Sequence, residues 1–293
     1  EVIVTTTFTT RKIRLKDNNV EDKFEYLNKK AGELVLNKGH KLRSQDLALL
    51  TSVGVLDVDV FERLNIGVLS TGDELVDDNK KTESFQIYDS NRPMIISKLQ
   101  SWGHNTYDLG IVRDCEEGLK SKIKSSKGKL DLIVTTGGVS VGKYDLIHKA
   151  LSRFKSKIEF WKIAMRPGKP LLFSKINKTP LIGLPGNPVS SGVCSMIFVN
   201  IAIKKMMGDT KKFPIYEKAI LNGKLLLNDQ RMDFVRAKIK NNNGYLYVNP
   251  IDKQDSSMIT QFSNSDCLIV RSPFDNAKFD GDLVNILKFP SNI

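Results

Sequence analysis

Short apolar segments alternate with helical patterns between residues 63 and 208, and this alternation restricts the fold more than any other feature of the chain. Four segments share a richness in Leu, Ile and Val and a length suited to strands: 66–69, 132–134, 171–173 and 181–184. Apolar residues also recur at helical spacing, as in the stretch from Pro188 to about Met207. Strands and helices in alternation form a parallel sheet covered on both faces. We therefore predict an α/β domain over 63–208.

The segments on either side have different patterns. Residues 1–62 hold short alternating strand patterns and one helix, which we expect at Gln45–Ser52 with Ser44 as its cap. This piece is too small for a core of its own, so we interpret it as the β-rich remnant of an N-terminal domain. Residues 209–293 contain short strands separated by Gly, Asn, Asp and Pro, which predicts a small C-terminal β-barrel or sandwich.

The charge balance favours anionic partners. The 293 residues include 45 Lys and Arg against 33 Asp and Glu, a formal net charge of +12. Nucleic acid, a membrane surface and phosphorylated small molecules all suit that sign, while a general enrichment in Lys would explain it without any partner. A nucleic-acid binder would carry aromatic residues interleaved with Lys and Arg. No such pattern is present, so we expect no nucleic-acid partner.

Cysteine usage and hydropathy indicate a reduced, cytosolic protein. Cys115, Cys194 and Cys267 are odd in number and far apart, and no CxxC pair occurs. The three histidines are also scattered, which argues against a zinc site. No uninterrupted run of 18 apolar residues occurs, so we expect no transmembrane helix. The first residues contain neither a signal peptide nor an initiator Met, which suggests a fragment.

A glycine-rich loop follows the predicted strand 132–134. It reads TTGGVSVGKYD over 135–145 and precedes a helical pattern, so its bare N–H groups are suited to seat an anion. The loop resembles the start of a Walker A sequence, but Tyr144 stands where Ser or Thr must bind magnesium. A phosphate seat for a nucleotide or pterin is the better interpretation, and a turn without a ligand is the alternative. The candidate residues are Gly137, Gly138, Ser140 and Gly142.

A second loop, GLPGNPVS over 183–190, follows the next strand. Asn187 suits a helix N-cap and Pro188 the first helical position, and Gly186 lets a ligand approach the backbone. A structural cap alone explains Asn187 and Pro188. Because two strand-to-helix turns of one parallel sheet open on the same edge, however, we expect both loops to contact one ligand.

A basic segment, WKIAMRPGKP over 161–170, supplies cations. If the segment is extended, Lys162 and Arg166 lie on one face and together suit an oxyanion. A solvated basic turn is the alternative.

Four carboxylates follow predicted strands or begin a predicted helix, and we expect them near the same edge of the sheet: Asp73, Glu74, Asp114 and Asp145. Hard oxygen ligands are typical of a magnesium site. Helix capping is the alternative for Asp73 and Asp145.

Six motifs in a fixed order resemble the molybdopterin molybdenumtransferase family, which includes bacterial MoeA and the gephyrin E domain. They are STGDEL at 70–75, YDSNR at 88–92, LGIVRD at 109–114, TTGGVSVGKYD, MRPGKP at 165–170 and GLPGNPVS. The resemblance covers most of the chain and weakens before about residue 30. It implies a MogA-like α/β domain that binds molybdopterin, followed by a small β-barrel.

The resemblance also implies an enzyme and its reaction. Members bind adenylylated molybdopterin and molybdate, hydrolyse the adenylate with Mg²⁺, insert molybdenum into the dithiolene and release AMP. Glu74, Asp114 and Asp145 are implied to hold magnesium or phosphate, and Lys162 and Arg166 to meet molybdate or phosphate. The implied substrate-binding residues are Thr71, Gly72, Asp73, Asn91, Gly137, Gly138, Ser140, Gly142, Pro185, Gly186, Asn187, Pro188, Ser190, Arg236 and Ser256 or Ser257.

Two departures and one alternative qualify this hypothesis. Asn28 stands where the family usually carries an acidic residue, and the family's N-terminal portion, with much of its homodimer interface, lies outside the chain. The sequence therefore leaves open whether the chain alone is active. The alternative is a gephyrin-like scaffold that clusters membrane receptors by binding their loop peptides. Catalysis is favoured because the three carboxylates are retained, whereas a scaffold would tolerate their loss.

Overall fold

The computed structural model describes residues 10–14, 34–77, 82–113, 121–122, 130–139, 147, 150–151, 156–211 and 213–289. The chain divides into two compact units. The first comprises residues 1–63 and 200–213, and the second comprises 64–199 and 214–293. The predictions made for Asn28, Asp114, Ser140, Gly142 and Asp145 lie outside the described residues.

The first unit contains a two-stranded antiparallel sheet and a short helix. Strand β1 (Thr10–Arg14) pairs with β2 (Asp57–Phe61), and α1 spans Ser44–Ser52. Our assignment of Ser44 as the helix cap was wrong, because the cap is Arg43. The carboxylate of Asp46 accepts hydrogen bonds from the Arg43 backbone N–H at 2.8 Å and from Arg43 Nε at 2.9 Å. The Arg43–Asp46 pair thus caps the first turn of α1, the role that we had predicted for the Ser44 hydroxyl.

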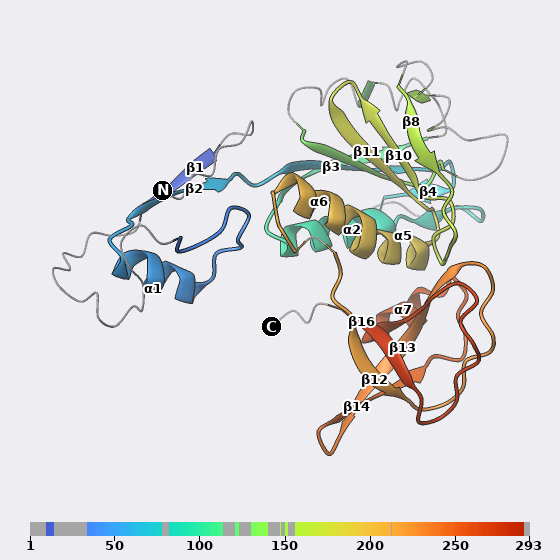
Figure 1. Ribbon diagram of the computed structural model, residues 1–293. Helices are drawn as coiled ribbons and strands as arrows, with labels where there is room; N and C mark the ends of the chain where they lie inside the picture. The colour runs from blue at the N-terminus through green and yellow to red at the C-terminus, as the bar shows by residue number, and fades with distance from the viewer. Residues whose placement is uncertain are drawn as a thin grey trace. The chain divides into compact units, whose positions relative to one another are not determined.

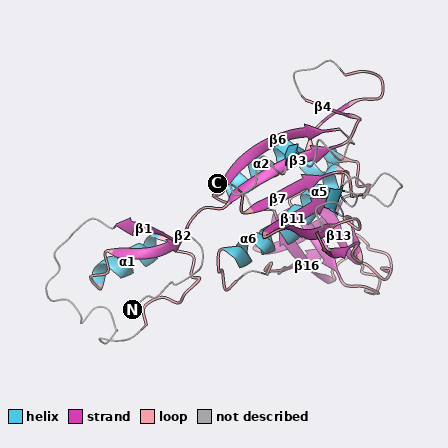
Figure 2. Cartoon of the chain, turned by 90° about the horizontal axis from the view of Figure 1, so that it is seen from above, coloured by secondary structure: helices cyan, strands magenta, loops and turns pink. Residues whose placement is uncertain are grey.

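The second unit is built on a six-stranded sheet in the order β6-β3-β7-β11-β10-β8. The strands are β6 (Asn105–Val112), β3 (Asn65–Thr71), β7 (Leu132–Thr136), β11 (Thr179–Leu184), β10 (Leu172–Ile176) and β8 (Ile158–Trp161). The first four are parallel, as predicted, and Figure 2 shows β6, β3, β7 and β11 side by side. Strand β10 is antiparallel to β11, because the two are joined by a turn at 177–178 that is too short for a parallel crossover. Strand β8 pairs antiparallel with β10 at the edge of the sheet.

Helices lie against the sheet (Figure 1). The first is α2 (Asn91–Ser101), which buries Ile95 and Leu99. The second is α5 (Pro188–Cys194), which continues into a π-helical segment (Ser195–Val199). The helix that follows in the chain, α6 (Asn200–Met206), is part of the first compact unit. The span Pro188–Met206 is long and apolar enough to cross a membrane by length and composition, but 61% of its most apolar window is buried within the protein. Such burial is typical of a core helix.

The C-terminal strands form a closed five-stranded barrel. They are β12 (Glu217–Leu221), β13 (Met232–Asn242), β14 (Tyr245–Pro250), β15 (Cys267–Arg271) and β16 (Leu283–Lys288). The order β14-β12-β16-β15-β13 closes because β13 also pairs with β14. Inward-facing residues such as Val235, Val248, Ile269 and Ile286 fill the interior. Closure removes the exposed sheet edges.

Two short pairings complete the fold of the second unit. Strand β4 (Leu75–Val76) pairs in parallel with β5 (Ile87–Tyr88). Strand β9 (Met165–Arg166), from the basic segment, pairs in parallel with β13 of the barrel, with Met165 opposite Met232 and Arg166 opposite Asp233. On the barrel side, α7 (Ile259–Ser263) places the Phe262 ring against Gly192 of α5, where a side chain would leave no room for the ring. The barrel is thus joined to the α/β domain by main-chain pairing and by packing.

Candidate functional site

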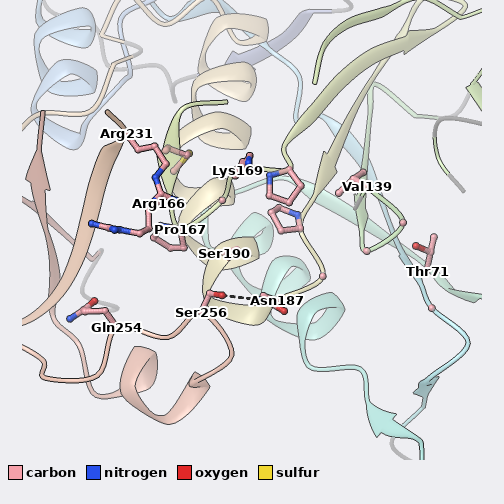
Figure 3. Close-up of a pocket in the computed structure, with 18 of the residues that line it drawn as sticks. Thr71, Val139, Arg166, Pro167, Lys169, Asn187, Ser190, Arg231, Gln254 and Ser256 are labelled. Atoms are coloured by element: carbon pink, nitrogen blue, oxygen red, sulfur yellow. Dashed lines mark hydrogen bonds between the residues drawn. The ribbon is translucent and has the colours of Figure 1, made fainter. Parts of the chain in front are cut away.

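A cavity of about 590 Å³ lies at the edge of the sheet where β3, β7 and β11 end. Loops of the α/β domain form one part of its wall and residues of the barrel form another (Figure 3). Among the described lining residues, three carry positive charge and one carries negative charge: Arg166, Lys169, Arg231 and Glu74. The carboxyl edge of parallel strands is the usual ligand site of an open α/β sheet.

The turns that follow β3 and β7 meet where Thr71 contacts Gly137 and Gly138. Gly137 and Gly138 have φ values of +79° and +64°, and a side chain at either would overlap Thr71. Thr71 is buried, and its hydroxyl has no hydrogen-bond partner among the described residues. A buried hydroxyl without a partner is costly unless a ligand or water satisfies it. This end of the cavity can therefore accept a polar ligand group against bare backbone and one hydroxyl.

The basic segment does not take the extended form that we assumed. Lys162 has a φ of +65°, so the chain turns there, and its ammonium group lies 3.8 Å from the centre of the Trp161 ring. Lys162 is absent from the cavity wall, whereas Arg166 and Lys169 line it. We expected Lys162 and Arg166 to share a face only if the segment were extended, and the turn at Lys162 means that this condition is not met.

Arg166 is held by two aspartates of the barrel side. Its Nε and Nη2 donate to Asp233 at 3.1 and 2.5 Å, and its Nη1 lies 3.5 Å from Asp229. The hydrogen bonds to Asp233 raise the pKa of the guanidinium above its usual value. Arg166 therefore stays charged and fixed at the junction between β9 and β13.

The loop before α5 is tied to the barrel at Ser256. The Asn187 side chain donates to Ser256 Oγ at 2.8 Å, and the Ser256 carbonyl accepts the Val189 N–H at 3.3 Å. Asn187 occupies the N-cap position as predicted, and Pro188 follows it, but the Asn187 side chain makes no capping bond. A carbonyl from the barrel contacts the helix N-terminus instead, so the Val189 N–H is not available to a ligand.

Behind this loop lies Arg236, which is 1% exposed and does not line the cavity. Its guanidinium donates to Gln254 Oε1 at 3.2 Å and to the carbonyls of Lys253 at 3.3 Å and Met258 at 3.4 Å. Our expectation that Arg236 reaches the ligand directly does not fit this burial. Its contacts instead fix the loop that presents Gln254 and Ser256 to the cavity.

The structure brings most of the described candidates to one cavity. Those that line it are Thr71, Gly72, Glu74, Gly137, Gly138, Arg166, Pro185, Gly186, Asn187, Ser190 and Ser256. The candidates that do not line it are Asp73, Asn91, Lys162, Pro188, Arg236 and Ser257. Of these, Asn91 still supports the wall, because its amide donates to the Gly186 carbonyl at 2.6 Å.

Sequence reasoning missed three polar lining residues: Lys169, Arg231 and Gln254. Lys169 belongs to the MRPGKP motif, but within that motif only Arg166 was predicted as a site residue. Arg231 precedes β13, and Gln254 lies in an irregular loop, so neither belongs to a strand-to-helix turn. No local pattern marks them, because the barrel reaches the cavity through tertiary pairing.

The described part of the chain contains no cluster of three His, Cys, Asp or Glu suited to a metal ion. Glu74 is the one carboxylate among the described lining residues. Its oxygen atoms suit a hard cation such as Mg²⁺, but one ligand does not make a site.

The fold and the cavity define a class: an α/β ligand-binding domain whose carboxyl-edge pocket is completed by a β-barrel. Residues 67–205 match the family described as a probable molybdopterin binding domain, and residues 218–289 match the MoeA C-terminal region, domain IV. The chain therefore carries a probable molybdopterin binding domain followed by a MoeA C-terminal region.

Named relatives agree with this assignment. The chain is 36% identical over 262 residues to a molybdopterin molybdenumtransferase of Haemophilus influenzae, covering 89% of this chain and 65% of the relative. It is 32% identical over 267 residues to the Staphylococcus aureus enzyme of the same name, covering 90% and 62%. The chain therefore spans less than two thirds of the length of these relatives.

A solved structure agrees as well. A molybdopterin biosynthesis MoeA protein from Pyrococcus horikoshii superposes with a TM-score of 0.74 at 27% identity, covering 89% of this chain and 63% of that one.

Proposed function

We propose that the chain forms the substrate-binding core of a molybdopterin molybdenumtransferase, which inserts molybdate into adenylylated molybdopterin and releases AMP with the help of Mg²⁺. The observation that carries this proposal is the cavity, in which a glycine-lined end and a cationic end face one chamber. Both substrates are anions with several oxygen atoms, and such groups are bound by backbone N–H groups and guanidinium forks.

Each end of the cavity suits a part of the substrate. Gly137 and Gly138 carry no side chains, so a flat or phosphorylated group can approach the main chain closely beside the unpartnered Thr71 hydroxyl. The Gly137 N–H itself already donates to the Leu184 carbonyl at 3.1 Å. Arg166 and Lys169 suit an oxyanion. The Asn187–Ser256 contact holds the two walls at a fixed separation. The chain's own residues thus bind and orient the substrate.

A magnesium ion fits the donor chemistry of the family's carboxylates. Glu74 would be one ligand, and the resemblance assigns Asp114 and Asp145 as the others. When bound, the ion would offset the charge of the departing phosphate.

The test uses the complete protein that contains this chain. We expect AMP release on addition of adenylylated molybdopterin, molybdate and Mg²⁺, measured by chromatography. Glu74→Gln removes a charge from the cavity wall and should slow AMP release by about tenfold or more, as expected when an electrostatic contact is lost. Glu159→Gln, on an exposed position of β8, is the matched control and should react at the wild-type rate.

Absence of AMP release from the wild-type protein would refute the proposed reaction. A Glu74→Gln protein as fast as the wild type would remove Glu74 from it. Asp145→Asn tests in the same assay the role implied by the resemblance, and we expect a slower rate with an unchanged melting temperature.

A second candidate function, a scaffold for receptor peptides, is favoured by apolar side chains on the barrel. Leu226, Leu227 and Phe274 are 76%, 70% and 70% exposed. They lie on neighbouring segments, since the Phe274 N–H donates to the Asp229 carbonyl and Leu225 pairs with Lys278. Exposed apolar groups of this kind are typical of interaction surfaces. Calorimetric titration with receptor loop peptides tests this candidate, and no heat at high micromolar peptide would count against it.

A further inference from the structure

Arg92, the last residue of the YDSNR motif, has no part in the proposed function. It stands in the first turn of α2, outside the cavity wall, and its side chain is only 12% exposed. We propose that Arg92 is a positioning residue for Glu74, because its ion pairs hold the short β4–β5 pairing that fixes the Glu74 main chain. The part that Glu74 plays in the reaction rests on the proposed function, whereas the hold on β4–β5 does not.

The Arg92 guanidinium uses all of its nitrogen atoms to bind aspartates. Nε donates to Asp89 at 2.9 Å, Nη1 donates to both carboxylate oxygens of Asp108 at 2.5 Å, and Nη2 donates to Asp77. Asp77 directly follows β4, Asp89 directly follows β5, and Asp108 lies on β6. One side chain therefore links three segments of the second unit, which the planar fork of an arginine allows and a single ammonium group does not.

Main-chain hydrogen bonds connect this ion-pair cluster to Glu74. The Ile87 N–H donates to the Glu74 carbonyl at 2.8 Å, and the Asp89 N–H donates to the Val76 carbonyl at 3.1 Å. A pairing of two such short strands has little stability of its own. The ion pairs of Arg92 act on the residue that directly follows each strand, so they supply the support that the pairing lacks.

The direction of the Glu74 carboxylate depends on the turn that precedes β4. The carboxylate lies over Gly72, where an added Cβ atom would be 2.7 and 2.8 Å from its two oxygen atoms. The Leu75 N–H donates to the Gly72 carbonyl at 3.3 Å and closes this turn. A shift of β4 therefore moves the carboxylate with it, and a misplacement of about 1 Å can slow a reaction by about a hundredfold.

Hydrogen–deuterium exchange of the complete protein, followed by mass spectrometry, tests the hold on β4–β5 without any substrate. Arg92→Gln leaves three aspartates without their shared cation, so the Ile87 and Asp89 amides should exchange about tenfold faster or more. Arg92→Lys keeps the charge but cannot bind three carboxylates together, so we expect an intermediate rate. Exchange within about twofold of the wild type in a folded Arg92→Gln protein overturns the proposal.

A double-mutant cycle on AMP release tests whether Arg92 acts through Glu74. Arg92→Gln should lower kcat about tenfold and change the KM for the pterin by less than about twofold, because it displaces a carboxylate without removing a substrate contact. In the Glu74→Gln background the same change should lower kcat by less than about twofold, since the carboxylate that it positions is gone. An equal loss of kcat in both backgrounds would indicate a purely structural role and would overturn the proposal.

Arg43→Gln is the matched control. Arg43 Nε lies 2.9 Å from Asp46 Oδ2, three residues away, as Arg92 Nε does from Asp89 Oδ2, but the Arg43 pair belongs to the first compact unit. Arg43→Gln should leave both kcat and the exchange of β4–β5 unchanged. If Arg92→Gln fails to fold, Arg92→Lys decides, and wild-type exchange together with wild-type kcat in that variant overturns the proposal.

The two proposals fail in different ways. Wild-type exchange in Arg92→Gln refutes the role of Arg92, while AMP release by the wild-type protein still supports the proposed function. If the wild-type protein releases no AMP, the proposed function fails and the role of Glu74 fails with it. Faster exchange in Arg92→Gln then still supports the hold of Arg92 on β4–β5.

Discussion

Gly168→Ala should be among the most destabilising single-methyl changes in the cavity wall. Gly168 has a φ of +115°, and a methyl group there would overlap Cys194 Sγ and lie 3.3 Å from two atoms of Met165. The backbone strain costs roughly 1–3 kcal/mol for an L-residue. Overpacking against a buried side chain adds roughly 1–3 kcal/mol. We therefore expect the free energy of unfolding to fall by about 2–6 kcal/mol, the sum of the two costs.

A double-mutant cycle separates these two causes. Cys194→Ala removes the atom that the methyl group would strike, so Gly168→Ala should cost about 1–3 kcal/mol less in that background. Gly223→Ala is the matched control, because Gly223 has a φ of +126° but its added methyl would lie 3.7 Å from its nearest neighbour. It should cost only the backbone strain and should not depend on Cys194.

Urea unfolding followed by tryptophan fluorescence is the assay, since both tryptophans, Trp102 and Trp161, lie in the second compact unit. Equal costs of Gly168→Ala with and without Cys194 would refute the close approach as the reason for glycine. In that case backbone conformation alone would explain it.

Two further predictions concern the domain junction and the thiols. Ser256→Ala removes the hydrogen bond from the Asn187 side chain but keeps the contact between the residue 256 carbonyl and α5. The free energy of unfolding should fall by only about 1 kcal/mol, while the affinity for the pterin, measured by calorimetry, should fall severalfold. An unchanged affinity would contradict a role of this hydrogen bond in spacing the cavity walls. Burial raises the pKa of Cys194 and raises that of Cys267 to about 12, so in a Cys115→Ser background neither thiol should react with Ellman's reagent at pH 8 before urea is added. Because a thiol in the unfolded chain ionises near pH 9, the free energy of unfolding should decline as pH rises from 9 toward 12. Rapid labelling of the native protein by Ellman's reagent would contradict the burial of these thiols.

The sequence predicted the parallel strands and their loops well, because these features are local. The apolar segments at 66–69 and 132–134 became β3 and β7, and their following turns meet at Thr71 and Gly137. Glycine and proline loops after buried strands also predicted where the cavity lies. These patterns repeat within a few residues, so a single sequence reveals them.

The errors arose where a distant contact overrides a local preference. Asn187 has the sequence context of a capping residue, but Ser256 of the barrel takes its side chain. Arg236 was expected at the ligand, yet its contacts bury it behind Gln254. The place of Arg231 depends on the pairing of β9 with β13, which joins residues far apart in the chain. No period in the sequence encodes such a pairing.

The pairing of β9 with β13 has a consequence for chimeric proteins. Main-chain hydrogen bonds set the register between the two domains whatever side chains they carry, so a barrel from a relative should dock onto this α/β domain. The charged side chains at the β9–β13 pairing cannot be exchanged in that way. Arg166 relies on Asp233, and the two would have to be transplanted as a matched set. A hybrid protein that kept Arg166 but lost Asp233 would retain the β9–β13 pairing, but the Arg166 guanidinium in the cavity wall would no longer be held in place.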